Sequence, residues 1–229
     1  MSKKIIVTGA TSGLGLAVIR ALKTEGYDPI LTGRSIKKVN ALSTDLNVPG
    51  YQLDVSDPQS IQSATKKITT DLGPIYGLIN NAGIWLEGDF EGYTPAAIQT
   101  VLDTNTTGTI LMTHALLPHM LERSEGVVIN TVSTGALYCR KLISVYAASK
   151  WAIRGFTGCL ELECAPKGVR VMGFYPGKID TNMYEAAGID RSMEVAMSPE
   201  QGASMVLVML KDQNMVWSHI SGRSIRDYQ

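Results

Sequence analysis

Short apolar runs alternate along the chain with longer stretches in which apolar residues recur at a helical period. The apolar runs predict strands at residues 4–7, 29–32, 51–53, 75–79, 127–132 and 169–175. The periodic stretches predict helices at residues 13–25, 35–45, 58–72, 95–123 and 145–166. This alternation indicates an α/β fold in which a doubly wound parallel sheet carries helices on both faces.

Turn-forming residues mark several of these boundaries. Gly26 follows the first predicted helix, and Asp57 precedes Pro58 at the start of the third. Residues 215–220 are apolar enough for a further strand, although Ser218 and His219 weaken that pattern. We therefore expect six to seven strands. Because no linker or internal repeat interrupts the 229 residues, we expect a single domain over residues 1–229.

Composition narrows the range of functions. The chain has 21 Lys and Arg against 21 Asp and Glu, so no net field favours nucleic acid or an anionic membrane. The apolar run at residues 5–7 is too short for a signal peptide, and no stretch reaches the ~18 apolar residues of a membrane span. We expect a cytoplasmic protein that binds neither nucleic acid nor membranes. Three cysteines without a C-x-x-C pair indicate no disulfide framework and no metal site.

A glycine-rich turn follows the first predicted strand and opens the first predicted helix. Residues 8–15 read T-G-A-T-S-G-L-G, with glycines at Gly9, Gly13 and Gly15. Glycine lets the backbone approach a pyrophosphate closely, and a helix N-terminus supplies free N–H donors and a favourable dipole. The turn therefore predicts a dinucleotide site; a tight turn with a purely structural role is the alternative.

The end of the second predicted strand indicates which dinucleotide would bind. An acidic residue there would accept the ribose 2′-hydroxyl of NAD, whereas an arginine suits the 2′-phosphate of NADP. The sequence places Gly33 and Arg34 at this point and has no carboxylate there. Arginine can pair with a phosphate through its planar fork, so NADP(H) is favoured over NAD(H). The alternative for Arg34 is a solvated charge at a helix start.

Candidate catalytic residues lie in the second half of the chain. Tyr146 and Lys150 are four residues apart on a predicted helix and share one face, and Ser133 ends the fifth predicted strand. A free tyrosine has a pKa of ~10, and a neighbouring ammonium together with a nicotinamide cation would favour its phenolate and lower that pKa. Tyr146 would then exchange a proton with a carbonyl or alcohol oxygen that Ser133 hydrogen-bonds. An ordinary helix-surface pair is the alternative for Tyr146 and Lys150.

These motifs together resemble those of the short-chain dehydrogenases/reductases, in their shorter single-domain branch. The resemblance spans residues 5 to about 181 and implies a Rossmann fold with NADP(H)-dependent oxidation of an alcohol or reduction of a small-molecule carbonyl compound. The matching motifs are T-G-A-T-S-G-L-G (8–15), D-V (54–55), N-N-A-G (80–83), N-T-T-G (105–108), N-T-V-S (130–133), Y-A-A-S-K (146–150) and P-G-K-I-D-T (176–181).

The resemblance also implies roles for individual residues. The catalytic set is Asn105, Ser133, Tyr146 and Lys150, in which Asn105 would hold a water of the proton relay and Lys150 would also bind the nicotinamide ribose. Asn105 alone could equally be a helix cap, and Asp54 a turn residue. The implied cofactor-binding residues are Gly9, Thr11, Ser12, Gly13, Leu14, Gly15, Gly33, Arg34, Asp54, Val55, Asn81, Ala82, Gly83, Tyr146, Lys150, Pro176, Gly177, Ile179 and Thr181.

The sequence identifies the residues around the substrate less clearly than those around the cofactor. Residues 181–198 are expected to form an adaptable apolar lid, and residues 134–145 and Trp85 to line the pocket. Arg140 and Lys141 would either attract an anionic substrate or form a solvated charge pair. The resemblance implies a homodimer, with a homotetramer as the alternative. The dimer is favoured because the C-terminal segment, which helps to form the tetramer interface in many relatives, matches the family poorly.

Two other functions remain open from the sequence. A sugar-nucleotide epimerase or dehydratase shares the tyrosine and lysine, but such relatives are longer and have a different glycine spacing. An NADP(H)-binding sensor or regulator on the same fold is the other possibility. Such proteins usually lose the tyrosine or the lysine, whereas this chain has both Tyr146 and Lys150.

Overall fold

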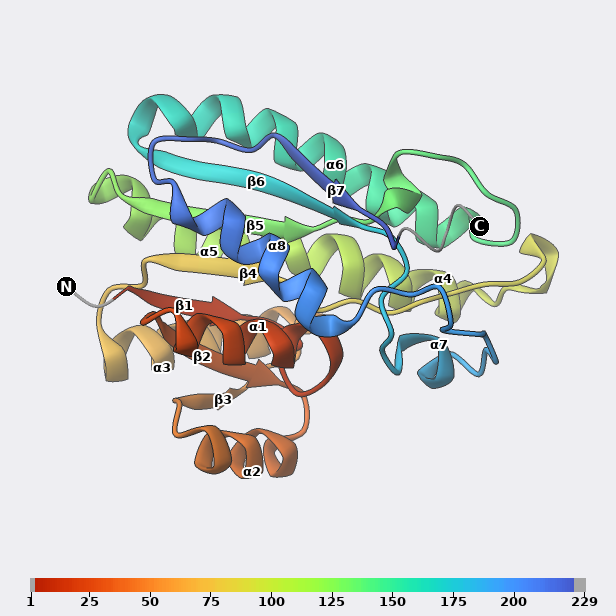
Figure 1. Cartoon of the computed structure of the whole chain (residues 1–229), viewed down its shortest axis with the longest axis horizontal. Coiled ribbons are helices and arrows are strands. Elements are labelled where there is room, and N and C mark those ends of the chain that lie inside the picture. Colours follow the sequence, from red (N-terminus) through yellow and green to blue (C-terminus); the bar gives the residue numbers. More distant parts are fainter. Residues whose placement is uncertain (1–2, 225–229) are drawn as a thin grey trace.

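A computed structural model describes residues 3–224 and contains one seven-stranded sheet in which every strand is parallel to its neighbours (Figure 1). The strand order is β3-β2-β1-β4-β5-β6-β7, which confirms the doubly wound sheet. The order reverses direction between β1 and β4, where ligands bind in this architecture. The strands are β1 (Lys4–Val7), β2 (Asp28–Gly33), β3 (Gly50–Gln52), β4 (Gly77–Asn80), β5 (Gly126–Thr131), β6 (Val169–Pro176) and β7 (His219–Gly222).

Two layers of helices cover the sheet. The first cluster of buried apolar side chains joins the sheet to α1 (Gly13–Thr24), α2 (Ile36–Leu46) and α8 (Pro199–Lys211). The second joins the opposite face to α3 (Pro58–Leu72), α5 (Gly108–Glu122) and α6 (Ser144–Cys164). In Figure 1, α1 and α8 lie side by side in front of the sheet, while α5 and α6 lie behind it. Both faces are therefore buried, as a parallel sheet requires.

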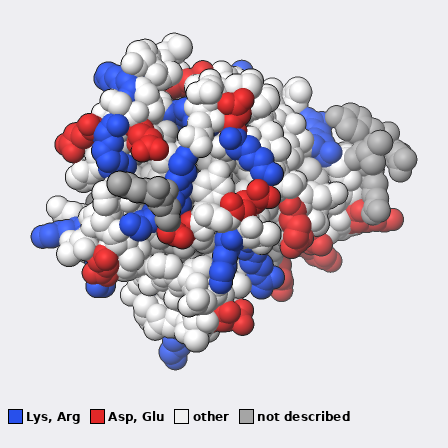
Figure 2. Space-filling view, turned by 60° about the vertical axis from the view of Figure 1, so that its left-hand side comes forward, with Lys and Arg blue, Asp and Glu red and all other residues white. Residues whose placement is uncertain are grey.

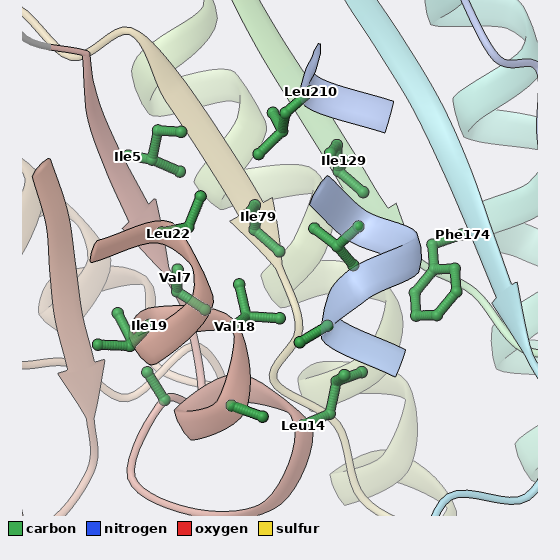
Figure 3. Close-up of a cluster of buried hydrophobic side chains, with 14 of the residues drawn as sticks. Ile5, Val7, Leu14, Val18, Ile19, Leu22, Ile79, Ile129, Phe174 and Leu210 are labelled. Atoms are coloured by element: carbon green, nitrogen blue, oxygen red, sulfur yellow. The ribbon is translucent and has the colours of Figure 1, made fainter. Parts of the chain in front are cut away.

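The alternation of side chains along β1 explains how one strand serves both cores. Ile5 and Val7 belong to the cluster that contains Leu14, Val18 and Leu22 of α1 (Figure 3), whereas Ile6 belongs to the cluster on the opposite face. Successive side chains of a strand point to opposite faces, so a continuous apolar run supplies both layers.

The structure corrects three details of the expected elements. The helix expected over residues 95–123 is divided into α4 (Pro95–Leu102), a π-helical segment η2 (Asp103–Thr107) and α5. The fifth strand ends at Thr131, so Ser133 lies beyond it and precedes the 3-10 turn η3 (Thr134–Ala136) rather than ending the strand. The seventh strand forms, but it begins at His219 and not at residue 215.

A buried arginine holds the connection that leads to β7. Arg170 of β6 is 6% exposed, and its Nη1 donates to the carbonyl oxygens of Met209, Asp212 and Met215 at 3.0, 2.9 and 3.4 Å. These carbonyls lie at the end of α8 and in the segment after it. A cation at a helix C-terminus satisfies carbonyls that have no partner within the helix and favours its dipole. This contact fixes the path of the chain between α8 and β7.

The surface carries charges of both signs. Figure 2 shows Lys and Arg side chains interspersed with Asp and Glu side chains on one face of the molecule, in keeping with the equal numbers of each in the sequence. Within residues 3–224, none of the helices combines the length and the apolar character needed to cross a membrane.

Candidate active site

A cleft of about 560 Å³ lies at the carboxyl ends of the strands, where the strand order reverses between β1 and β4. It is lined by every cofactor-site residue expected from the sequence and by three of the four expected catalytic residues. Asn105, the fourth, is buried behind the lining at 1% exposure. Two helix N-termini open on the cleft, those of α1 and α2, because their first residues or the residues just before them line it.

The glycine turn leaves the start of α1 open to the cleft. Gly9 and Gly13 have φ angles of +63° and +51°, which side chains with a Cβ rarely adopt. Ser12 precedes α1 but its side chain makes no capping hydrogen bond, and the first turn contains no acidic residue. The backbone N–H groups at this end are thus free of side-chain acceptors, an arrangement suited to a phosphate.

Asn81, just after β4, fastens the glycine turn to the middle of the sheet. Its Nδ2 donates to the carbonyl oxygens of Thr8 and Gly9 at 3.0 and 3.3 Å. In return, the backbone N–H groups of Asn81 and Ala82 both donate to Thr8 Oγ1 at 3.0 Å. The N-N-A-G segment therefore fixes one wall of the cleft through hydrogen bonds to the first strand–helix turn.

The far end of the cleft is basic. Arg34 lies directly after β2, and Ser35 and Lys38 of the following turn line the cleft beside it. Asp54 is the only acidic residue in the lining, and its Oδ1 already accepts hydrogen bonds from the backbone N–H and the hydroxyl of Ser56 at 3.0 and 2.7 Å. Lys38 was not expected from the sequence; its place in the first turn of the helix that follows Arg34 was the available signal.

Tyr146, Lys150 and Ser133 meet at the other end of the cleft. Tyr146 and Lys150 lie on the first turns of α6, with the Lys150 Nζ 5.8 Å from the centre of the Tyr146 ring. Lys150 Nζ also donates to the carbonyl oxygen of Thr131 at 2.9 Å. Ser133 has φ +151°, outside the usual range for a residue with a side chain, and its Oγ accepts from the backbone N–H of Gly135 at 3.0 Å.

Burial governs the proton affinities of this group. It raises the pKa of Tyr146 to about 12, against a hydrogen bond with the Ser133 side chain and the charge of Arg140, both of which lower it. Burial also lowers the pKa of Lys150 to about 8. The acidic tyrosine expected from the sequence is therefore not a property of the protein groups alone. A further positive charge near the hydroxyl would be needed to favour the phenolate.

Asn105 connects two walls of the cleft, the loop after β4 and helix α6, through its side-chain hydrogen bonds. It lies in the π-helical segment η2, its Oδ1 accepts from the backbone N–H of Ile84 at 2.8 Å, and its Nδ2 donates to Ile84 O and Ser149 Oγ at 3.0 and 3.1 Å. A π-helical turn inside a helix often marks a functional site. Here Asn105 bridges the loop after β4 and α6; its role in a water relay stays a prediction.

An aromatic cluster covers Tyr146 on the substrate side. The ring centres of Trp85 and Tyr146 are 4.3 Å apart, and those of Trp85 and Tyr184 are 4.9 Å apart. Tyr184 belongs to the short helix α7 (Met183–Ala186), so the lid expected at residues 181–198 reaches this cluster. The lid is held by Arg191, whose Nη2 lies 2.7 Å from Glu87 Oε2. The pairing of Glu87 with Arg191 was not expected from the sequence, because 104 positions separate the two residues.

The side chains around the cleft are mostly neutral or basic, and few of them are metal-ligand types. Among residues 3–224, no group of three or more His, Cys, Asp or Glu side chains is placed to hold a metal ion. The close packing of the glycine turn requires glycine at position 15, because a Cβ added at Gly15 would lie 2.5 Å from the carbonyl oxygen of Gly9. The cleft thus joins a phosphate-type site to a tyrosine, a lysine and a serine.

The sequence and the structure of this chain are similar to those of known proteins. The family model for short chain dehydrogenase matches residues 3–192. The chain is 37% identical to a serine 3-dehydrogenase of Rhizobium radiobacter over 79% of this chain and 74% of the relative. It is 35% identical to an uncharacterized oxidoreductase of Staphylococcus epidermidis over 80% of both chains. The closed form of a serine dehydrogenase complexed with NADP+ superposes with a TM-score of 0.91 at 28% identity, covering 96% of this chain and 94% of that chain.

Proposed function

The chain belongs to the short-chain dehydrogenase/reductase family of oxidoreductases, and on that premise we propose that it transfers hydride between NADP(H) and a small carbonyl or alcohol compound. The observation that carries the proposal is the meeting of Tyr146, Ser133 and Lys150 in one cleft with the glycine turn. The relatives support alcohol chemistry, since the name of the Rhizobium radiobacter relative is serine 3-dehydrogenase and serine carries a hydroxyl at carbon 3.

Each protein group has a defined part in the proposed reaction. When bound, the dinucleotide supplies a hydride to a carbonyl carbon or accepts one from an alcohol carbon. Tyr146 donates its hydroxyl proton to the carbonyl oxygen in reduction and removes the proton from the alcohol in oxidation. Ser133 hydrogen-bonds the same oxygen and stabilises the charge that develops on it. Lys150 supplies the ammonium that favours the Tyr146 phenolate.

The residues of the cleft also support NADP(H) over NAD(H). The free N–H groups of α1 and the glycine turn would hold the pyrophosphate. Arg34, Ser35 and Lys38 would hold the 2′-phosphate at the basic end, where Asp54 is already engaged by Ser56. A structural relative complexed with NADP+ is in accord with this choice. The homodimer, the single domain and the cytoplasmic location expected from the sequence stay predictions.

A turnover assay with a matched variant tests the proposal. The protein is incubated with a panel of ketones, aldehydes and alcohols and with either cofactor, and absorbance is followed at the reduced-nicotinamide band. We expect turnover with NADPH or NADP+ for some member of the panel and at least a thousandfold loss in Tyr146→Phe, whose affinity for NADPH stays within about twofold. Binding of NADPH without turnover on the whole panel would instead favour a sensor, and full activity of Tyr146→Phe would remove the tyrosine mechanism.

A further inference from the structure

Two guanidinium groups approach the substrate end of the cleft, and they differ in whether they have a partner. Arg191 is bound to both carboxylate oxygens of Glu87, with side-chain exposures of 25% and 14%. Arg140 lines the cleft with Ser133 and Tyr146 and has no hydrogen bond, ion pair or ring contact within residues 3–224. The charge of Arg191 is therefore neutralised, whereas that of Arg140 has no counter-charge among residues 3–224.

The charge of Arg140 acts on the same end of the cleft as the reacting groups. Burial raises the pKa of Tyr184, as it does that of Tyr146, and the positive charge of Arg140 opposes this rise at both hydroxyls. The side chains of Tyr146, Tyr184 and Arg140 all line the cleft. An anion placed in this part of the cleft would meet the guanidinium of Arg140, which makes no hydrogen bond or ion pair within residues 3–224.

The backbone around Arg140 is held in place although the side chain is exposed. The carbonyl oxygen of Leu142 accepts hydrogen bonds from the backbone N–H of Gly88 and from the Tyr93 hydroxyl, at 2.8 and 2.9 Å. Leu142 itself has φ +67°, a left-handed conformation that is unfavourable for a leucine. This wall of the cleft is therefore tied to the loop after β4. Its fixed path keeps Arg140 next to the catalytic end.

We propose that Arg140 binds a carboxylate on the substrate, so that the enzyme acts on short oxo acids or hydroxy acids rather than on neutral carbonyl compounds. The proposal rests on the proposed function and names its substrate class. Arginine suits this task because its planar fork pairs with a carboxylate through two parallel hydrogen bonds. Tyr184, whose side chain also lines the cleft, is placed to donate a further hydrogen bond to the same group.

The test compares acids with their own methyl esters. Reduction by NADPH is measured for 2-oxobutanoate, acetoacetate and 4-oxopentanoate and for the three methyl esters, which retain the carbonyl but lack the negative charge. We expect kcat/KM to favour the acid by about tenfold or more in at least one pair, mainly through KM, as a hydrogen-bonded ion pair would provide. Arg140→Met should abolish this preference, and Arg140→Lys should restore part of it.

Matched controls separate a local effect from a general one. Lys141→Met removes the adjacent exposed charge, which does not line the cleft, and should leave the preference for the acid intact. Arg140→Met should bind NADPH as the unmodified protein does, which shows that the fold is retained. Equal use of acid and ester, or a preference that survives Arg140→Met, overturns the inference. Turnover of neutral aldehydes and ketones alone overturns it while the proposed function stands, and no turnover of any carbonyl compound overturns both.

Discussion

The indole ring of Trp85 packs against the phenol ring of Tyr146, with ring centres 4.3 Å apart and an interplanar angle of 48°. Trp85 Nε1 donates to Glu87 Oε2 at 2.8 Å, and the same carboxylate accepts from Arg191 of the lid. The guanidinium of Arg191 also lies 4.9 Å from the centre of the Tyr184 ring. The position of the lid and the surroundings of Tyr146 are therefore linked through one carboxylate.

Loss of this ion pair should loosen the lid. In Arg191→Met, we expect endoproteinase Glu-C to cut after Glu185 or Glu194 at least five times faster than in the unmodified protein, because a partly buried, doubly hydrogen-bonded pair stabilises the closed lid by about 1–2 kcal/mol. Lys211→Met is the control, since it breaks only the exposed pair with Glu25. Equal cleavage of Arg191→Met and Lys211→Met would show that the ion pair does not hold the lid.

Cofactor preference should depend on the basic end of the cleft. Arg34→Ala should weaken binding of NADPH by about tenfold or more and that of NADH by less than twofold, because only NADPH carries the 2′-phosphate. Lys38→Ala should have the same selectivity with a smaller loss. Dissociation constants from nicotinamide fluorescence measure both effects. Lys37→Ala, an exposed neighbour that does not line the cleft, is the control, and an equal loss for the two cofactors would contradict the assignment.

Lys150 should lower the free energy of unfolding near neutral pH, and this effect should become smaller as the pH rises. Its pKa falls from 10.5 to about 8 on folding, so the folded protein binds the proton less tightly than the unfolded chain. The resulting cost is full below pH 8 and disappears as the pH rises towards 10.5. Lys150→Met should therefore be more stable by about 1–3 kcal/mol at pH 7, the lost hydrogen bond to Thr131 included.

Urea unfolding at several pH values measures this difference. The gain of Lys150→Met over the unmodified protein should shrink steadily between pH 8 and 10.5. Lys141→Met, at an exposed position, should show no such trend. A Lys150→Met protein that is less stable at pH 7, or a gain that is constant up to pH 10.5, would contradict the lowered pKa.

Arg170 should be required for the C-terminal edge of the sheet. Arg170→Met leaves the buried carbonyl of Met209 and the partly buried carbonyl of Asp212 without this donor, and we expect a loss of about 3 kcal/mol in the free energy of unfolding. Backbone amides of β7 should exchange hydrogen faster in this variant. Arg20→Met, at an exposed position of α1, should leave the urea midpoint unchanged. If Arg170→Met unfolds at the same midpoint, the contact does not stabilise this edge.

Most of the fold followed from local patterns. Apolar runs and helical periods identified six strands and the main helices because side-chain burial repeats with the period of each element. The site motifs were equally local, since Gly13 opens a helix, Arg34 directly follows a strand, and Tyr146 and Lys150 lie about one helical turn apart. Parallel strands end at one edge of the sheet, so residues that follow different strands could be expected to meet there.

The sequence by itself thus determined most of the elements, the parallel sheet and many of the residues that line the cleft. Only the tertiary structure decided how those residues are held and charged. In the π-helical turn, Asn105 contacts residues 21 and 44 positions away, and the ion pair between the lid and Glu87 spans 104 positions. The pKa values of Tyr146 and Lys150 depend on burial, which many distant segments produce together. Such contacts leave no periodic trace in the sequence, and they exist only once the chain has folded.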